Sequence, residues 1–267
     1  ASELPEGSVS FLYFADRVNQ LPLGVVGAAV GVALLPLLAR QLRAGDTAAA
    51  RDSQNRAIEF AMLLTVPAAA ALLVIAGPVI TVLFQRGAFD ALDAAATSQA
   101  LAAFALGLPA YVLIKALAPG FFAREDTKTP VKIAAAALIL NVAVALALMP
   151  ILAHVGIALA TAISAWFNAG MLGFLLYRRG LLDPDARLLR RLGRVVLAAG
   201  LMAVGLWLGA RGLGDWLQRS DLAGVAALVV LVAGGVVAYA VLAQLLRATS
   251  LGEMRTMLRR GESPGES

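Results

Sequence analysis

The chain has 267 residues, of which 60% are hydrophobic and 15% are charged, and its mean hydropathy is +0.82. Soluble domains carry about a quarter charged residues, so these values indicate a membrane protein. The sequence contains no cysteine, which excludes disulfides, thiolate metal sites and a cysteine nucleophile within this chain. Because His154 is the single histidine, an all-histidine metal site is excluded too. We therefore expect neither a metal ion nor another cofactor.

Repeated apolar stretches are long enough to cross a hydrocarbon core of about 30 Å as helices. The expected fold is therefore all-α, a polytopic helical membrane protein with seven transmembrane helices in this chain. The fourth and fifth stretches are separated by so few residues that we expect them to form a tight hairpin. The expected spans are 9–39, 57–83, 99–122, 131–150, 155–177, 192–210 and 222–246.

The first span carries a charged residue, Arg17, directly before an uncharged run from Val18 to Ala39. Arginine facing lipid is costly, whereas arginine facing a cavity marks a candidate functional site. Steps of three and four residues keep side chains on one helical face, and Arg17 belongs to such a stripe. We expect this stripe to face protein or a water-filled cavity, with Asp16 beside it and within hydrogen-bonding reach of Gln20 and Tyr13. The stripe comprises Ser10, Tyr13, Arg17, Gln20, Gly24, Gly27 and Gly31.

The basic residues predict the orientation of the chain. Most of the 22 lie in alternate connections between spans, and only Arg86, Arg211 and Arg219 lie in the others. By the positive-inside rule the basic connections are cytoplasmic, so the charge is a topology signal and no nucleic acid is expected as a partner. Seven spans then place the amino-terminal end outside and the carboxyl terminus in the cytoplasm. No signal segment precedes the first span, so we expect this chain to be the carboxyl-terminal part of a longer polypeptide.

Three separated motifs occur in a characteristic order. Together they resemble the MurJ (MviN) family of lipid II flippases over about residues 7–180. The motifs are Gly7-Ser-Val-Ser with Tyr13, Ala15-Asp-Arg and Leu21-Pro; Leu83-Phe-Gln-Arg-Gly-Ala-Phe; and Leu117-Ala-Pro-Gly-Phe-Phe-Ala-Arg with Asp126-Thr-Lys-Thr-Pro-Val-Lys.

The resemblance implies a domain organisation. Members of the family have two six-helix lobes of the multidrug/oligosaccharidyl-lipid/polysaccharide exporter type around a central cavity, followed by two further helices. Residues 1–180 then correspond to five of the six helices of the second lobe, 181–250 to the two extra carboxyl-terminal helices, and 251–267 to a cytoplasmic tail. The implied partners are the missing amino-terminal half of the same polypeptide and membrane lipids.

The resemblance also implies an activity that makes and breaks no bond. The family moves lipid II, the undecaprenyl-diphosphate-linked disaccharide-pentapeptide, from the inner to the outer leaflet of the bacterial cytoplasmic membrane by alternating access. Arg17 matches an important cavity arginine, and a guanidinium can bind diphosphate oxygens bidentately. Gln20 stands where many members carry glutamate. The structural alternatives are an ion pair of Arg17 with Asp16 or with a carboxylate in the missing half, and a role for Asp16 in fixing one helix to another.

Three other polar residues within the spans are candidate site residues. Lys115 either snorkels to the cytoplasmic interface or attracts an anionic head group to the inner mouth of the cavity. Asn141 and Thr161 are expected at equal depth in the hairpin, where they could offer oxygens to a cation such as sodium. Because position 145 is alanine, no carboxylate completes that set, and an interhelical hydrogen bond is the favoured alternative.

Two other functions fit parts of the sequence. One is a related flippase or exporter for another lipid-linked oligosaccharide. The other is a membrane enzyme acting on polyprenyl phosphates, which would need clustered acids near the membrane surface. Glu125-Asp126 is the only adjacent acidic pair in a basic connection, and no further acid follows it directly.

Overall fold

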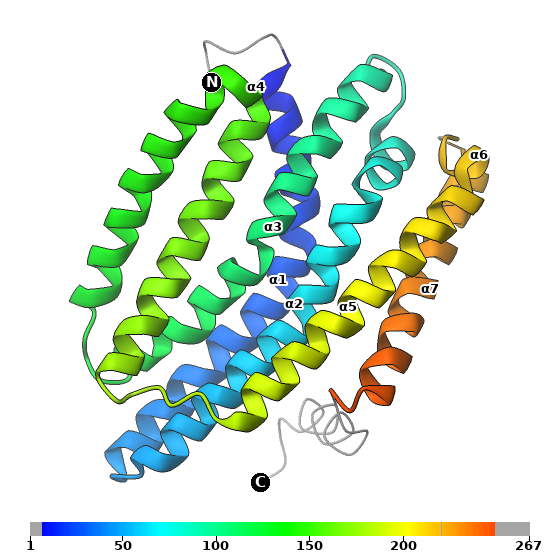
Figure 1. The fold of residues 1–267 in the computed structure, drawn as a ribbon. Coiled ribbons are helices and arrows are strands. Elements are labelled where there is room, and N and C mark those ends of the chain that lie inside the picture. The colour runs from blue at the N-terminus through cyan, green and yellow to red at the C-terminus, as the bar shows by residue number, and fades with distance from the viewer. Residues whose placement is uncertain (1–6, 220, 249–267) are drawn as a thin grey trace, which may run out of the picture.

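The computed structural model of the chain describes residues 7–219 and 221–248, with residues 25, 26 and 28–33 described by their backbone alone. Within these residues all regular secondary structure is helical, which confirms the predicted fold class. The predicted tail, 251–267, lies outside the described residues. The helices are α1 (Ser8–Arg43), α2 (Thr47–Phe84), α3 (Ala91–Phe122), α4 (Lys128–Arg178), α5 (Ala186–Gly212), α6 (Gly214–Leu217) and α7 (Leu222–Leu245) (Figure 1).

Five of the described helices, α2, α3, α4, α5 and α7, are long and apolar enough to cross a membrane. The longest, α4, reverses direction at Ala153, whose φ of 46° and ψ of −129° interrupt the helix. Gly156 allows the two arms to meet, because an added Cβ would lie 2.8 Å from the carbonyl carbon of Leu148. This one element therefore supplies the predicted hairpin of the fourth and fifth spans (Figure 1).

Aspartates begin most of the long helices. Asp46, Asp185 and Asp221 each accept a hydrogen bond from a backbone N–H in the first turn of α2, α5 and α7. Asp90 and Asp93 form a reciprocal capping box, so α3 begins at Ala91 and not near the predicted residue 99. The hydrophobic run marks the part of the helix within the membrane, whereas these caps mark where the helix starts.

The helices pack side by side with α3 near the centre. It contacts α1 and α2 on one side and the α4 hairpin on the other. α5 packs on α2, and α7 packs on both α2 and α5 (Figure 1). Alanines with no exposed surface, including Ala15, Ala100, Ala105 and Ala158, lie in these contacts. Small residues let membrane helices approach closely, which explains the alanine content of this core.

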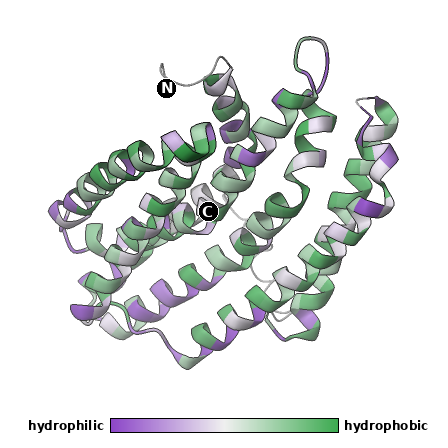
Figure 2. Ribbon diagram, turned by 45° about the horizontal axis from the view of Figure 1, so that its top comes forward, coloured by the Kyte–Doolittle hydropathy of each residue, from purple (hydrophilic) through white to green (hydrophobic). Residues whose placement is uncertain are grey.

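The basic connections gather at one end of the bundle. The turn between α1 and α2, the loop between α3 and α4, the link from α4 to α5 and the end of α7 all lie there (Figures 1 and 2). Glu59, whose side chain is only 10% exposed, pairs at this end with Arg56 of the same helix and with Arg191 of α5. The charges that predicted the topology therefore also fix α5 to α2.

Candidate functional site

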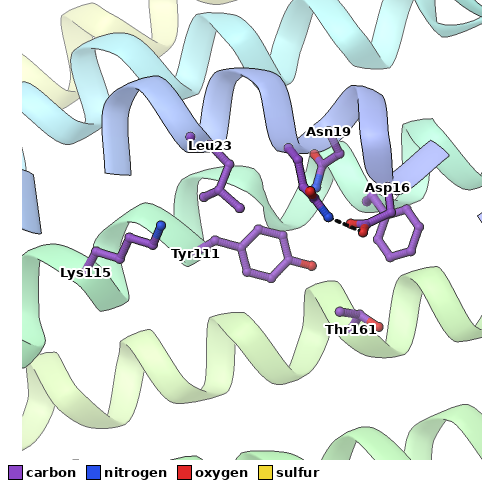
Figure 3. A pocket seen from close by; sticks show the side chains of 9 residues that line it. Asp16, Asn19, Leu23, Tyr111, Lys115 and Thr161 are labelled. Carbon is purple, nitrogen blue, oxygen red and sulfur yellow. Dashed lines mark hydrogen bonds between the residues drawn. The ribbon is translucent and has the colours of Figure 1, made fainter. Parts of the chain in front are cut away.

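A polar pocket of about 430 Å³ lies between α1, α3 and α4. Three helices contribute to it, so no short sequence motif describes it. Figure 3 shows Lys115 at one end and Asp16 at the other, with the ring of Tyr111 between them. The lining residues are Asp16, Asn19, Gln20, Leu23, Gly24, Phe104, Tyr111, Lys115 and Thr161.

The polar atoms of this pocket are only partly satisfied by one another. Gln20 donates a side-chain hydrogen bond to Asp16, as the sequence predicted. Asn19 is 2% exposed, and its Oδ1 has no hydrogen-bond partner among the described residues. The buried hydroxyl of Tyr111 also lacks a partner there. Both atoms have almost no accessible surface, so they lie behind the wall of the pocket and do not face its open space.

Lys115 lies along α1 at the other end of the pocket. A Cβ built on Gly27 would be 2.7 Å from Lys115 Nζ, so the missing side chain of that glycine makes room for the lysine. Gly27 belongs to the predicted stripe, and its role here is to receive a side chain. The surroundings of Gly31 lie outside the described residues.

Arg17 does not line this pocket. Its guanidinium carbon lies 4.8 Å from the centre of the Tyr13 ring, a cation–π arrangement, and both residues are exposed on α1. No ion pair joins Arg17 to Asp16 among the described residues. The predicted stripe therefore presents Tyr13, Arg17 and Gln20 on an open face of α1. The pocket lies next to this face, and Gln20 also lines the pocket.

Asn141 and Thr161 meet across the α4 hairpin. Asn141 Nδ2 donates to Thr161 Oγ1 at 3.4 Å and to Ser164 Oγ at 3.2 Å. Each hydroxyl in turn donates to a backbone carbonyl of its own helix. The favoured interhelical hydrogen bond is therefore present, and the cation site stays a prediction.

An apolar groove of about 390 Å³ lies on another side of α1, between α1, α2, α5 and α7. Val18 and Leu21 of α1 line it together with Leu72 of α2, Leu206 of α5 and Val236 of α7. It runs along apolar side chains close to the face that carries Arg17. α1 thus separates an apolar groove from a polar pocket.

Asn19 and Tyr111 were not among the residues singled out in the sequence. Asn19 follows Asp16 by one helical turn, and Tyr111 precedes Lys115 by one turn, so each shares a face with a charged residue. This spacing of one helical turn from a charged residue is the sequence signal that could have identified both residues. The predicted stripe reaches the pocket through Gln20 and Gly24, whereas Asn19 lies on a neighbouring face of the same helix.

Several helices are long and apolar enough to cross a membrane, and a pocket lined by charged and polar side chains lies among the helices. These features define a polytopic membrane protein with a polar site between its helices. Residues 1–226 match the family model described as lipid II flippase MurJ. The chain belongs to the MurJ family.

Similar curated proteins carry the same description. The chain is 45% identical to the probable lipid II flippase MurJ of Rhizobium tropici, over 96% of this chain and 48% of that protein. It is 45% identical to the Rhizobium meliloti (strain 1021) protein of that name, over 97% of this chain and 49% of the relative. It is also 36% identical to the lipid II flippase MurJ of Burkholderia cenocepacia, over 76% of this chain and 40% of that protein. The chain spans about half the length of the curated relatives it matches.

Proposed function

We propose that this chain is the carboxyl-terminal part of a lipid II flippase. The complete polypeptide would move the undecaprenyl-diphosphate-linked peptidoglycan precursor from the inner to the outer leaflet of the bacterial cytoplasmic membrane. Transport would proceed by alternating access, with no bond made or broken. Membership of the MurJ family supports the substrate class, and the polar site between membrane-length helices supports a passage for a charged head group.

The observation that carries this proposal is the position of Arg17. It lies exposed on a 36-residue helix whose following turns carry no charge until Arg40. A guanidinium keeps its charge and donates in a fork that matches phosphate oxygens, so it suits a diphosphate inside a cavity. The Tyr13 ring lies against the guanidinium in a cation–π contact, while Gln20 extends the polar face.

The remaining features fit parts of the same substrate. Residues 1–180 would form five helices of the second lobe, facing an amino-terminal half across the cavity. The two helices after residue 180, α5 and α7, complete the apolar groove, which suits a long isoprenoid tail. The basic end of the bundle would be cytoplasmic, where it would also contact anionic lipid head groups.

The test uses bacterial cells depleted of their own flippase and supplied with the complete polypeptide. Export of the lipid-linked precursor to the outer leaflet is measured at matched membrane abundance for the wild type, Arg17→Ala and Arg17→Lys. We expect Arg17→Ala to lower export by at least about tenfold, since losing one charge-assisted contact costs about 1.5–3 kcal/mol. The activity of Arg17→Lys then separates the need for charge from the need for a bidentate fork.

Arg211→Ala is the matched control, because Arg211 stacks on Trp207 at 3.6 Å but lies at the end of α5, away from the pocket. It should export normally. Normal export by Arg17→Ala would show that Arg17 is structural. If the wild type itself fails to export this precursor, the alternative is a transporter for another lipid-linked oligosaccharide.

A further inference from the structure

Two arginines come together at the basic end of the bundle, where α2, the loop after α3 and the link after α4 meet. Arg51 lies near the start of α2, and its Nη2 is 3.8 Å from the position that a Cβ on Gly180 would take. Arg124, in the loop between α3 and α4, donates a 2.6 Å hydrogen bond to the carbonyl of Gly120. That glycine lies against α2, because an added Cβ would be 2.9 Å from Oε1 of Gln54, one helical turn after Arg51. Both arginines therefore belong to the junction of these three segments.

The positive charges at this junction have no carboxylate beside them. Neither Arg51 nor Arg124 forms an ion pair within the part of the chain that the structure describes. Burial, followed by the positive charge of Arg51, lowers the pKa of Arg124 below its ordinary value. Two like charges in a partly buried place repel each other, and a bound anion removes that repulsion. The junction therefore attracts an anion.

Other arginines at the same end of the bundle are balanced by carboxylates. Arg56 of α2 pairs with Glu59 and with Asp185, and Arg191 of α5 pairs with Glu59 as well. These arginines are partly buried, as Arg51 and Arg124 are. The chain thus supplies carboxylates to one group of arginines and none to the pair at the junction. The contrast indicates that the junction takes its counter-charge from a separate molecule.

A phosphate group fits two arginines better than a carboxylate does. A guanidinium donates in a fork that matches the oxygens of either anion, but a phosphate group carries more oxygens and can accept from both arginines. The junction lies at the ends of helices long enough to cross a membrane, which is the depth of lipid head groups. Phe122 ends α3 close to Arg124, Tyr177 lies in the last turn of α4, and both are exposed. Exposed aromatic side chains at this depth suit contact with lipid.

We propose that Arg51 and Arg124 together bind the phosphate group of an anionic phospholipid in the cytoplasmic leaflet. The inference goes beyond the proposed function, because it concerns a lipid that stays bound to the protein and not the molecule that is transported. The bound phosphate would neutralise both arginines and connect α2 to the base of the α4 hairpin. A soluble phosphate ester offers the same group without acyl chains, so the experiment has to separate the two sources.

The experiment measures binding to the complete polypeptide in micelles of an uncharged detergent, by native mass spectrometry. The probes are phosphatidylglycerol, the diacylglycerol with the same acyl chains, and glycerol 3-phosphate. Wild-type protein should bind phosphatidylglycerol at least about tenfold more tightly than diacylglycerol, since only the former offers charge-assisted hydrogen bonds. Glycerol 3-phosphate should compete only weakly, because it has no chains to bury. If it displaces phosphatidylglycerol at comparable concentrations, the ligand is a soluble phosphate ester and the lipid assignment is wrong.

Substitutions test the two arginines. Arg51→Gln and Arg124→Gln should each lower the affinity for phosphatidylglycerol at least about tenfold. Arg51→Lys keeps the charge without the fork and should recover part of the affinity. Arg43→Gln is the matched control, because Arg43 lies exposed at the same end of the bundle and forms no ion pair among the described residues. Its affinity should stay within about twofold of wild type, since an exposed charge contributes little.

Thermal unfolding checks that the loss is one of binding and not of folding. Without lipid, Arg51→Gln should unfold at the wild-type temperature or above it, because the substitution removes a like charge and breaks no ion pair among the described residues. Added phosphatidylglycerol should raise the unfolding temperature of the wild type and leave that of Arg51→Gln nearly unchanged. A merely structural role of Arg51 would predict the reverse, a lower unfolding temperature without lipid.

Two further results would overturn the phosphate site. Equal losses of affinity in Arg51→Gln, Arg124→Gln and Arg43→Gln would show a general attraction of anionic lipid to the basic end. Wild-type affinity in both Arg51→Gln and Arg124→Gln is the result expected if a carboxylate of the amino-terminal half pairs with these arginines. Neither result bears on the proposed transport, which the export of the lipid-linked precursor tests separately.

Discussion

At the residue scale, Tyr239 on α7 donates a 2.7 Å hydrogen bond to the backbone carbonyl of Leu63 on α2. That carbonyl is four residues before Pro67, which lies inside α2 and has no N–H to offer it. The hydrocarbon core of a membrane holds no water that could form a hydrogen bond with an unpaired backbone group. The tyrosine therefore satisfies a carbonyl that proline has freed, and it fixes α7 beside the apolar groove.

We expect Tyr239→Phe to lower the free energy of unfolding by about 0.6–1.7 kcal/mol, which are the average and the maximum found for interhelical hydrogen bonds in a membrane protein. The measurement is reversible unfolding in mixed micelles. A double-mutant cycle with Pro67→Ala isolates the mechanism, because alanine restores the N–H that can bond Leu63. In that background the tyrosine hydroxyl should contribute less. Equal losses in both backgrounds would show that the hydroxyl acts through something other than the freed carbonyl.

At the element scale, Asp126 closes the base of the α4 hairpin. It accepts from the Thr129 N–H at 3.0 Å and from the Thr129 hydroxyl at 2.7 Å, at the start of the first arm. Arg179, directly after the second arm, donates to it at 2.7 Å. The hydrogen bonds from Thr129, followed by that from Arg179, hold the pKa of Asp126 well below its ordinary value.

A carboxylate whose pKa is lowered in the folded state stabilises that state above its ordinary pKa of about 3.9. The contribution is lost as the pH falls from there through the lowered pKa. We therefore expect the difference in thermal stability between wild type and Asp126→Asn to be constant near neutral pH and to shrink below about pH 4. Thermal unfolding from pH 7 to pH 3 measures it.

Glu125→Gln, at the neighbouring carboxyl, is the control for general effects of loop charge. It should remain close to wild type near neutral pH, where Asp126→Asn is less stable. A difference between wild type and Asp126→Asn that stays constant down to pH 3 would contradict the assigned role of the carboxylate.

The elements were largely predictable because hydropathy reports membrane burial directly. The reversal between the arms of α4 and the position of the long apolar helices followed from the apolar runs alone. Helix starts were less predictable, since capping by Asp90 and Asp46 extends α3 and α2 beyond their apolar segments.

The site was only partly predictable from the sequence. The period of α1 placed Tyr13, Arg17 and Gln20 on one face, and the structure agrees. The pocket depends on how α1, α3 and α4 are rotated against one another, and no periodicity within a single helix contains that information. Asn19 and Tyr111 consequently became visible only when the three helices were assembled.

At the scale of the whole molecule, both ends of the bundle are polar, but most of the basic residues lie at one of them. The connections with few basic residues lie at the end that holds the loop between α2 and α3 (Figure 1). The proposed transport direction requires this end to face outward and the basic end to face the cytoplasm. Orientation is thus the property on which the residue-level proposals depend.

Because the chain contains no cysteine, a thiol reagent can label this chain only at a cysteine introduced by mutation. Single introduced cysteines can therefore report the orientation. Ala88 lies exposed in the α2–α3 loop, and Ala44 lies exposed at the turn between α1 and α2. In the complete polypeptide, with any cysteine elsewhere replaced by serine, a membrane-impermeant maleimide should label Ala88→Cys in intact spheroplasts. Ala44→Cys should be labelled only after permeabilisation, because the positive-inside rule places its loop in the cytoplasm. Permeabilised cells should label both equally, which controls for reactivity. The opposite pattern in intact spheroplasts would place the basic end outside, and Lys115, toward that end of α3, could then not receive an anionic group from the cytoplasmic side.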